Sequence, residues 1–332
     1  MAGLAEIRLR AQSRARIPKQ VLAFYYGWYA NPEISQHWFH WKDVDQAGHH
    51  IAESTHFPAL GAYDSHDPKV IETHCREAKE CGLTGFIASW WRQGDFHDRG
   101  LPPLLEAAHR HGLRVSVYYE TAPQPASPKP EDVAADISYI VRTYGNHPAW
   151  LSVNGKPVIF VYSRAIAQLT LDGWRKVILG FAADHPPGAV FIGDQISPEA
   201  AQVFDGIHTY NPTAQTKGMT AAQIDAWARK TFREWVETAG PRIACVTIIP
   251  GFDDSVQPSR KPPRPITERH DGDTYRAMWR EAIAASPDWI LITSWNEWHE
   301  GSEIEPSLEL GDRYLQITRE FAPKFTRRSE RR

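Results

Sequence analysis

The feature that most constrains this chain is an end-to-end alternation of short apolar runs with longer segments of helical period. Each run has the length of a buried strand, and each segment between runs repeats its apolar residues as an amphipathic helix does. The runs predict strands at Val21–Tyr26, Thr84–Trp90, Arg114–Glu120, Pro157–Tyr162, Val190–Asp194, Gly206–Tyr210, Arg242–Ile249 and Trp289–Trp295. The segments between them predict helices near Pro68–Cys81, Leu101–His111, Pro130–Tyr144, Asp172–Asp184, Pro198–Phe204, Ala221–Glu237 and Thr274–Ala285, and a last helix near Gly311–Phe321.

Eight strands that alternate with helices predict the α/β class and a single (β/α)8 TIM barrel. The residues at the predicted helix ends support this assignment. Asp67-Pro68 is typical of a helix start, and Gly82 and Gly112 are typical of helix ends. A doubly wound open sheet also alternates strand and helix. No Gly-x-Gly-x-x-Gly follows the first predicted strand, which weighs against a dinucleotide-binding version of that sheet.

The 332 residues are compatible with one barrel domain, which we expect to span 18–322. Residues 1–17 and 323–332 are predicted to be flexible tails, the first of them basic. Two of the predicted loops that lead from strand to helix are long, one after the first strand (27–67) and one after the seventh (251–273). Barrel enzymes carry their chemistry on these loops, and long loops in compact domains are usually functional.

Composition excludes several classes of partner. The net charge is -3 and the pI is about 6.6, so neither nucleic acid nor an anionic membrane surface is an expected partner. The N-terminus has no uninterrupted apolar core of a signal peptide, and no run is long enough to cross a bilayer. We therefore expect a cytoplasmic protein, or a secreted or periplasmic one if a leader has been removed.

The three cysteines predict no disulfide framework. Cys75 and Cys81 are six residues apart on one predicted helix, so they lie on different faces, and Cys245 lies in an apolar run.

The segment Ser294-Trp295-Asn296-Glu297-Trp298-His299-Glu300-Gly301 carries the strongest chemical signal. Two carboxylates, Glu297 and Glu300, stand three residues apart at the end of a buried strand. An acid, a base and flat apolar surfaces together are the components that cut a sugar–sugar bond. Trp295 and Trp298 can also exclude water from one carboxyl and so separate the two pKa values. The alternative is a solvated acidic turn.

Polar or aromatic residues gather at the ends of most other predicted strands, and a barrel brings those ends into one rim. They occur in Phe24-Tyr25-Tyr26-Gly27-Trp28-Tyr29, Ser89-Trp90-Trp91, Tyr118-Tyr119-Glu120, Gly193-Asp194-Gln195 and His208-Thr209-Tyr210-Asn211. The chain has 13 Trp, 12 Tyr and 13 Phe, which suits a carbohydrate cleft because sugar rings stack on flat faces. Large cores also consume aromatic residues, so packing is the alternative.

These segments resemble glycoside hydrolase family 99. The resemblance runs from about Val21 to Pro306 in the same order along the chain, and Asn296-Glu297-Trp298-His299-Glu300-Gly301 is its most specific element. The other matching segments are the first two strand ends, Asp98-Arg99, Gly145-Asn146-His147-Pro148-Ala149, Asn154-Gly155-Lys156-Pro157 and Pro250-Gly251. A looser Asn-Glu-Trp-x-Glu-Gly also occurs in related proteins from polysaccharide gene clusters.

The resemblance implies a (β/α)8 barrel and a retaining endo-α-mannosidase or endo-α-mannanase that cleaves internal, α-1,2-type linkages. In that family the first glutamate of the motif is a base toward the sugar's own 2-hydroxyl, which attacks the anomeric carbon to give a 1,2-anhydro sugar. The second glutamate protonates the leaving oxygen and later activates water. These roles would fall on Glu297 and Glu300 respectively.

Supporting residues follow from the resemblance and from their places at strand ends. Glu120 matches an acidic position after the third strand, although Thr121-Ala122-Pro123 replaces an aromatic-containing loop, and Glu303 stands where the family often has Gln. Neighbours on a strand point to opposite faces, so Tyr25 or Tyr26, and Trp90 or Trp91, can face the site. His299 is expected to orient its neighbours. The candidate substrate-binding residues are Tyr25, Tyr26, Trp28, Trp90, Trp91, Glu120, Asp194, Tyr210, Trp295, Asn296, Trp298 and His299.

No cofactor is expected. Fifteen histidines invite a metal hypothesis, but metal-dependent hydrolase barrels carry His-x-His at the end of the first strand, where this chain has Tyr25-Tyr26-Gly27-Trp28. The expected partner is an oligosaccharide or polysaccharide, and the oligomeric state is left open. Two other hypotheses are an enzyme that hydrolyses or transfers a different α-linked sugar in polysaccharide processing, and a non-catalytic carbohydrate-binding barrel.

Overall fold

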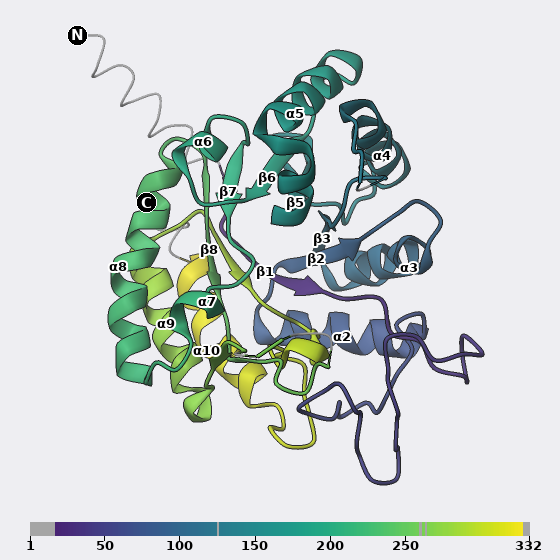
Figure 1. Ribbon diagram of the computed structural model, residues 1–332, viewed down its shortest axis with the longest axis vertical. Coiled ribbons are helices and arrows are strands. Elements are labelled where there is room, and N and C mark those ends of the chain that lie inside the picture. The colour runs from purple at the N-terminus through teal and green to yellow at the C-terminus, as the bar shows by residue number, and fades with distance from the viewer. Residues whose placement is uncertain (1–16, 125, 259–260, 263, 328–332) are drawn as a thin grey trace.

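A computed structural model of the chain describes residues 17–124, 126–258, 261–262 and 264–327. In these residues the main sheet has nine strands, of which eight are parallel, and the pairing of β3 with β5 closes these eight into a barrel (Figure 1). Around the barrel the strands are β1 (Gln20–Tyr25), β2 (Gly85–Trp90), β3 (Arg114–Tyr119), β5 (Lys156–Val161), β6 (Val190–Asp194), β7 (Gly206–His208), β8 (Ile243–Ile248) and β11 (Trp289–Ile292). The predicted (β/α)8 barrel is confirmed.

Helices follow the strands and surround the barrel (Figure 1). They are α2 (Pro68–Cys81), α3 (Phe96–His111), α4 (Pro130–Tyr144), α5 (Ser163–Asp184), α6 (Pro198–Ala201), α7 (Thr213–Thr216), α8 (Ala221–Ala239), α9 (Asp273–Ala285) and α10 (Arg313–Thr326). The shorter elements are β4 (Ser152–Val153), β9 (Phe252–Asp253), β10 (Ile266–Thr267), η1 (His270–Gly272) and η2 (Trp298–Glu300).

Both ends of α2 lie where the capping residues of the sequence predict them. The side chain of Asp67 accepts a hydrogen bond from the Lys69 amide, and Gly82 ends the helix in the left-handed conformation at φ 93°. Other boundaries differ from the prediction. The Asp95 carboxylate caps α3 at Phe96, earlier than expected. Within α5, Thr170 is non-helical at φ 65° and ψ 165°, so the helical segment after it agrees with the predicted helix Asp172–Asp184, and the segment that begins at Ser163 was not predicted.

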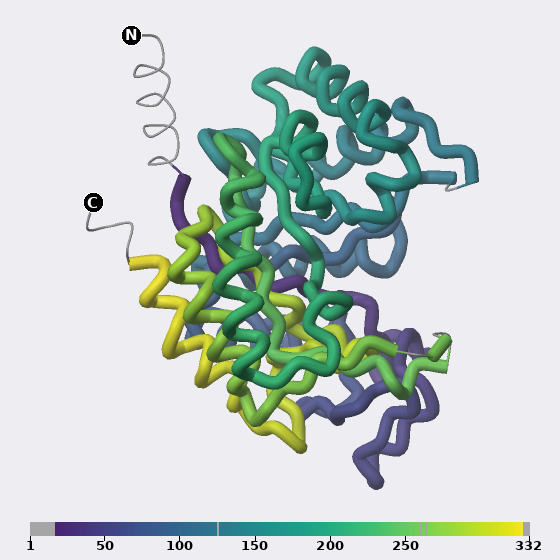
Figure 2. Tube along the Cα trace, turned by 60° about the vertical axis from the view of Figure 1, so that its left-hand side comes forward, coloured from purple at the N-terminus to yellow at the C-terminus, as the bar shows by residue number. Residues whose placement is uncertain are grey.

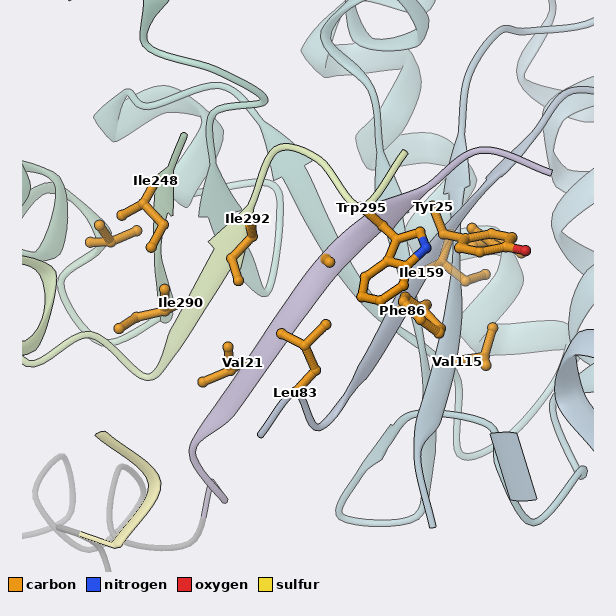
Figure 3. Packing of buried hydrophobic residues seen from close by; sticks show 14 of the residues in the cluster. Val21, Tyr25, Leu83, Phe86, Val115, Ile159, Ile248, Ile290, Ile292 and Trp295 are labelled. Atoms are coloured by element: carbon orange, nitrogen blue, oxygen red, sulfur yellow. The ribbon is translucent and has the colours of Figure 1, made fainter. Parts of the chain in front are cut away.

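The strands alternate their side chains between two apolar layers. On β1, Val21, Ala23 and Tyr25 belong to the layer between strands and helices, while Leu22 and Phe24 belong to the layer inside the barrel. Figure 3 shows part of the outer layer, where Val21, Ile248, Ile290 and Ile292 pack side by side. The same alternation decides which residues at the strand ends face inward.

The two long loops meet on one side of the barrel. The Gln257 side chain, in the loop after β8, donates a hydrogen bond to the Glu53 carbonyl in the loop after β1 at 2.9 Å, and Figure 2 shows the two loops next to each other. The antiparallel pair β9–β10 lies within the loop after β8.

The C-terminus differs from the prediction, whereas the cysteines agree with it. The predicted C-terminal tail is wrong for residues 323–326, because α10 continues to Thr326 and buries Phe325. Residues 1–16 and 328–332 lie outside the described residues. Cys75, Cys81 and Cys245 are buried and free, as expected. Among the described helices, none has the length and apolar character to cross a bilayer.

Candidate active site

The segment that follows β11 carries the two predicted carboxylates. Glu297 precedes the single turn η2 and caps it, because its Oε1 atom accepts a hydrogen bond from the His299 amide at 3.2 Å. The buried Ser294 hydroxyl accepts from the Glu297 amide at 2.7 Å. These bonds hold Glu297 in one conformation, and its residue is only 3% exposed.

Glu300, at the end of the same turn, is partly exposed and belongs to a relay of hydroxyl groups. The Tyr26 hydroxyl donates to the Tyr210 hydroxyl at 2.6 Å, and the Tyr210 hydroxyl donates to Glu300 Oε2 at 3.2 Å. Burial, followed by the nearby carboxylates, raises the pKa of both tyrosines well above 10.0, so both hydroxyls stay neutral donors. The turn closes at Gly301, which has φ 54° and approaches the Asp253 backbone closely.

A third carboxylate, Glu120, lies at the end of β3 within the electrostatic field of the other two. Its Oε1 atom accepts from the Ser89 hydroxyl at 2.8 Å, and its Oε2 atom lies 3.4 Å from Arg164 Nη2. Burial raises the pKa of Glu120 to about 8; Ser89 and Arg164 oppose the rise, and the charges of Glu297 and Glu300 add to it. Three carboxyl groups therefore gather at the carboxyl ends of the strands, and Glu120 keeps its proton up to a pH of about 8.

His299 is the neighbour that most directly affects Glu297. Its Nε2 atom lies 2.9 Å from the His40 carbonyl and its Nδ1 atom lies 3.4 Å from Glu297 Oε1. Burial lowers the pKa of His299, but the hydrogen bond and the charge of Glu297 outweigh burial and leave the pKa raised above 6.5. When it is protonated, the His299 ring therefore places a positive charge next to Glu297.

Three of the predicted substrate-binding residues do not face this site, and those predictions are wrong. Tyr25 packs on Phe86 and hydrogen bonds to His74 of α2, Trp90 donates to Asp98, and Trp295 also packs on Phe86. Figure 3 shows Tyr25, Phe86 and Trp295 together in the outer apolar layer. Strand alternation turns Tyr25 and Trp90 toward the helices, and Trp295 follows after the chain has left β11.

Three other predicted binding residues are buried behind the site, where protein groups satisfy their polar atoms. Asn296 bonds to both backbone groups of Tyr26, at 2.7 and 2.9 Å. Asp194 accepts from the Tyr118 hydroxyl and from the Tyr210 amide, and the Trp298 indole donates to the Tyr63 hydroxyl. Their prediction as substrate contacts is corrected to a positioning role.

The remaining predicted residues lie around the carboxylates. The Trp28 ring is 4.5 Å from the Tyr26 ring, and the Trp91 indole donates to the Ser89 hydroxyl. Tyr26, Trp28, Trp91, Glu120, Tyr210 and His299 therefore stay candidates for substrate contact.

Sequence reasoning missed Arg164, which lies between two aromatic rings beside Glu120. Its guanidinium carbon is 4.6 Å from the Trp91 ring centroid and 5.2 Å from the Tyr162 ring centroid. The available signal was its position two residues after the predicted strand Pro157–Tyr162. Reasoning also missed the groups that pair with Glu303 and Glu305. Arg269 and His56 contact Glu303 at 2.7 and 2.8 Å, and His74 contacts Glu305 at 3.0 Å.

The residues that the structure describes contain no group of three or more His, Cys, Asp or Glu side chains that could hold a metal ion. The site instead offers carboxylates, neutral hydroxyl donors and aromatic faces at the carboxyl ends of barrel strands. That arrangement defines a (β/α)8-barrel enzyme of the glycoside hydrolase class.

Comparison with known proteins gives the family. The family model described as glycosyl hydrolase family 99 matches residues 16–317, so the chain belongs to this family and is a glycoside hydrolase. A rat relative named glycoprotein endo-alpha-1,2-mannosidase is 28% identical over 92% of this chain and 75% of its own length. A human glycoprotein endo-alpha-1,2-mannosidase-like protein is 26% identical over 95% of this chain and 78% of its own.

The comparison with solved structures gives the same family. The GH99 endo-alpha-mannosidase from Bacteroides thetaiotaomicron, in complex with BIS-TRIS-propane, superposes with a TM-score of 0.78 at 28% identity, covering 94% of this chain and 98% of that one. A beta-galactosidase from Marinomonas ef1 superposes with a TM-score of 0.55 at 11% identity, which reflects the shared barrel fold alone.

Proposed function

We propose that this protein is a retaining endo-α-mannosidase that cleaves internal α-1,2 linkages of mannan or mannose-rich glycans. The family and the names of its relatives support the α-mannoside substrate. The arrangement of Glu297 and Glu300 around one turn supports the reaction type. The observation that carries the proposal is the different environment of these two carboxyls in a shared site.

Glu297 is suited to the role of base. It is buried, it accepts the His299 amide, and its Oε1 atom lies 3.4 Å from the ring nitrogen of a histidine whose pKa is raised. In the proposed first step Glu297 takes the proton of the sugar's 2-hydroxyl, and that oxygen forms a bond to the anomeric carbon. The bond from the anomeric carbon to the glycosidic oxygen breaks at the same time.

Glu300 is suited to the role of acid. Its carboxyl is partly exposed and held by the Tyr210 hydroxyl, so it can approach a glycosidic oxygen and return to the same position. It gives its proton to the leaving oxygen, and the product is a 1,2-anhydro sugar. In the second step Glu300 takes a proton from water, whose oxygen bonds to the anomeric carbon. The bond from that carbon to the 2-oxygen breaks, and Glu297 returns its proton, so the α-configuration is retained.

The test is the stereochemistry of the first product. Proton NMR during hydrolysis of an α-1,2-linked mannooligosaccharide should show the new reducing end as the α-anomer before mutarotation. Initial release of the β-anomer would contradict the proposed mechanism. Incubation with a nucleotide sugar and an acceptor glycan should give no sugar transfer, which would exclude the transferase hypothesis. Binding of the oligosaccharide without any hydrolysis product would instead favour a non-catalytic barrel. Activity should survive EDTA, since no step uses a metal ion.

A further inference from the structure

A row of aromatic rings leads from the hydroxyl relay to the protein surface. The Tyr26 and Trp28 ring centroids are 4.5 Å apart, and Trp28 stacks on His40 at 4.4 Å with an interplanar angle of 7°. The next ring, Phe39, meets His40 edge-on at 4.5 Å. The loop after β1 thus extends the aromatic surface of the site over several side chains.

Phe39, the exposed ring of this row, and two residues close to it in the chain are apolar and exposed. Ile34 is 47% exposed, Trp38 is 43% exposed and Phe39 is 36% exposed. Among the large hydrophobic side chains that are exposed in the described residues, Trp38 and Phe39 are the aromatic ones. Exposed apolar groups that gather in one place usually mark a binding surface.

This exposed segment is tied to the catalytic turn. Ala30 and Phe39 exchange two backbone hydrogen bonds of 3.0 and 3.1 Å, and the Asn31 side chain accepts from the amides of Glu33 and Ile34. The adjoining His40 carbonyl lies 2.9 Å from His299 Nε2. Since the segment is already ordered, a ligand that binds it loses little conformational entropy in the protein.

We infer that Trp38, supported by Phe39, forms a distal subsite on which a sugar residue of the bound glycan stacks. The inference rests on the proposed function, because the occupant is the continuation of the glycan whose scissile bond lies at Glu297 and Glu300. A glycan fits better than a protein partner because Phe39, the chain neighbour of Trp38, is the exposed ring of the aromatic row that begins inside the site. Flat aromatic faces offer a sugar ring a large apolar contact at low entropic cost.

The experiment compares kcat/KM for α-1,2-mannooligosaccharides of increasing length. In the wild-type protein kcat/KM should rise once the chain is long enough to reach Trp38. In Trp38→Ala the ratio of kcat/KM for long over short substrates should fall roughly two- to tenfold, the size of one aromatic contact. Trp38→Phe should recover most of that ratio, because it restores a flat ring.

Leu179→Ala is the matched control, because Leu179 is an exposed apolar residue of helix α5, at 65% exposure. It should leave the length ratio at the wild-type value. A wild-type enzyme that cleaves short and long substrates equally, or a Trp38→Ala variant with an unchanged ratio, would overturn the distal subsite while leaving the proposed function intact. Absence of hydrolysis at every length would instead remove the proposed function.

Binding supplies a measurement that does not depend on turnover. In a Glu300→Gln background, calorimetry with the longest oligosaccharide should show a Kd that Trp38→Ala raises by a similar factor. Sedimentation of wild-type and Trp38→Ala protein tests the other occupant. A change of mass between them would show that the segment contacts a second copy of the chain and would contradict a glycan subsite.

Discussion

Four glutamates lie within nine residues of each other, and the structure surrounds the first two differently from the last two. Glu297 and Glu300 interact with groups of their own turn and with the Tyr210 hydroxyl. Glu303 and Glu305 are buried against cationic or ionisable groups from distant elements, Arg269, His56 and His74. The comparison shows that the second pair joins the segment after β11 to the loops and to α2, whereas the first pair contacts its own turn and a neutral hydroxyl, as the proposed function requires of reacting groups.

The Arg269 side chain illustrates the structural role of the second pair. Its Nη2 atom donates to the carbonyls of Gly301 and Glu303 at 2.9 and 3.0 Å, and its guanidinium carbon lies 4.5 Å from the Tyr314 ring centroid. One cation in the loop after β8 therefore fixes the backbone directly after Glu300. The free energy of these contacts stabilises the geometry in which the first pair can work.

The largest effect should come from changing the first pair. Glu300→Gln removes the proton donor, and general acid catalysis is worth roughly 10²–10⁴ in rate. We expect kcat for α-mannan to fall within that range while the thermal midpoint stays near the wild-type value. Glu297→Gln should lose turnover and still bind oligosaccharide in calorimetry. Wild-type turnover in either variant would refute the assigned role.

Removing a cation that contacts the second pair of glutamates should instead lower the free energy of unfolding. Arg269→Met leaves the buried Glu303 without its strongest cation, and removal of one partner of a buried ion pair costs about 3–5 kcal/mol. Urea unfolding should show that loss. Arg276→Met, which breaks a more exposed pair with Glu320, is the control and should cost less than about 1 kcal/mol. Equal losses in the two variants would remove the distinction between the regions.

His299→Gln should have an intermediate effect on the first pair. Hydrogen bonds to charged groups contribute about 1.5–3 kcal/mol, so we expect kcat/KM to fall roughly tenfold to a hundredfold. The raised pKa means that the stabilisation of folding by protonated His299 is fully present below pH 6.5 and is lost as pH rises through the raised value. Urea titrations across pH 6–9 should show this decline in the wild-type protein and lack it in the variant.

Glu120→Gln should give the smallest of these effects, a change in how the free energy of unfolding varies with each unit of pH. The pKa of Glu120 is raised from 4.5 to about 8, so between these values the folded protein holds a proton that the unfolded chain has lost. Stability should therefore fall as pH rises through this window, by at most about 1.4 kcal/mol per pH unit from this group. The variant should have a flatter profile in urea unfolding. An identical slope would show that Glu120 is ionised in the folded protein.

The sequence alone was informative where local pattern and chemistry coincide. Alternating periods predicted the barrel, and Asp67 and Gly82 predicted the ends of α2. The positions of Glu297 and Glu300 predicted two carboxyls directly after the last barrel strand, where the structure places them beside η2, and their catalytic role stays a proposal. These features depend on residues that are close together in the chain, so they can be predicted without knowledge of the tertiary contacts. The end of α10 was misplaced because the packing of Phe325 depends on distant contacts.

The tertiary structure decided which member of each neighbouring pair faces the site. Strand alternation separates Tyr25 from Tyr26 and Trp90 from Trp91, but only closure of the sheet determines which face becomes the interior. It also decided that Trp295 packs in the core and that Glu303 meets Arg269. Residue type and spacing therefore determined the available chemistry, whereas contacts between segments far apart in the chain determined which groups share one environment.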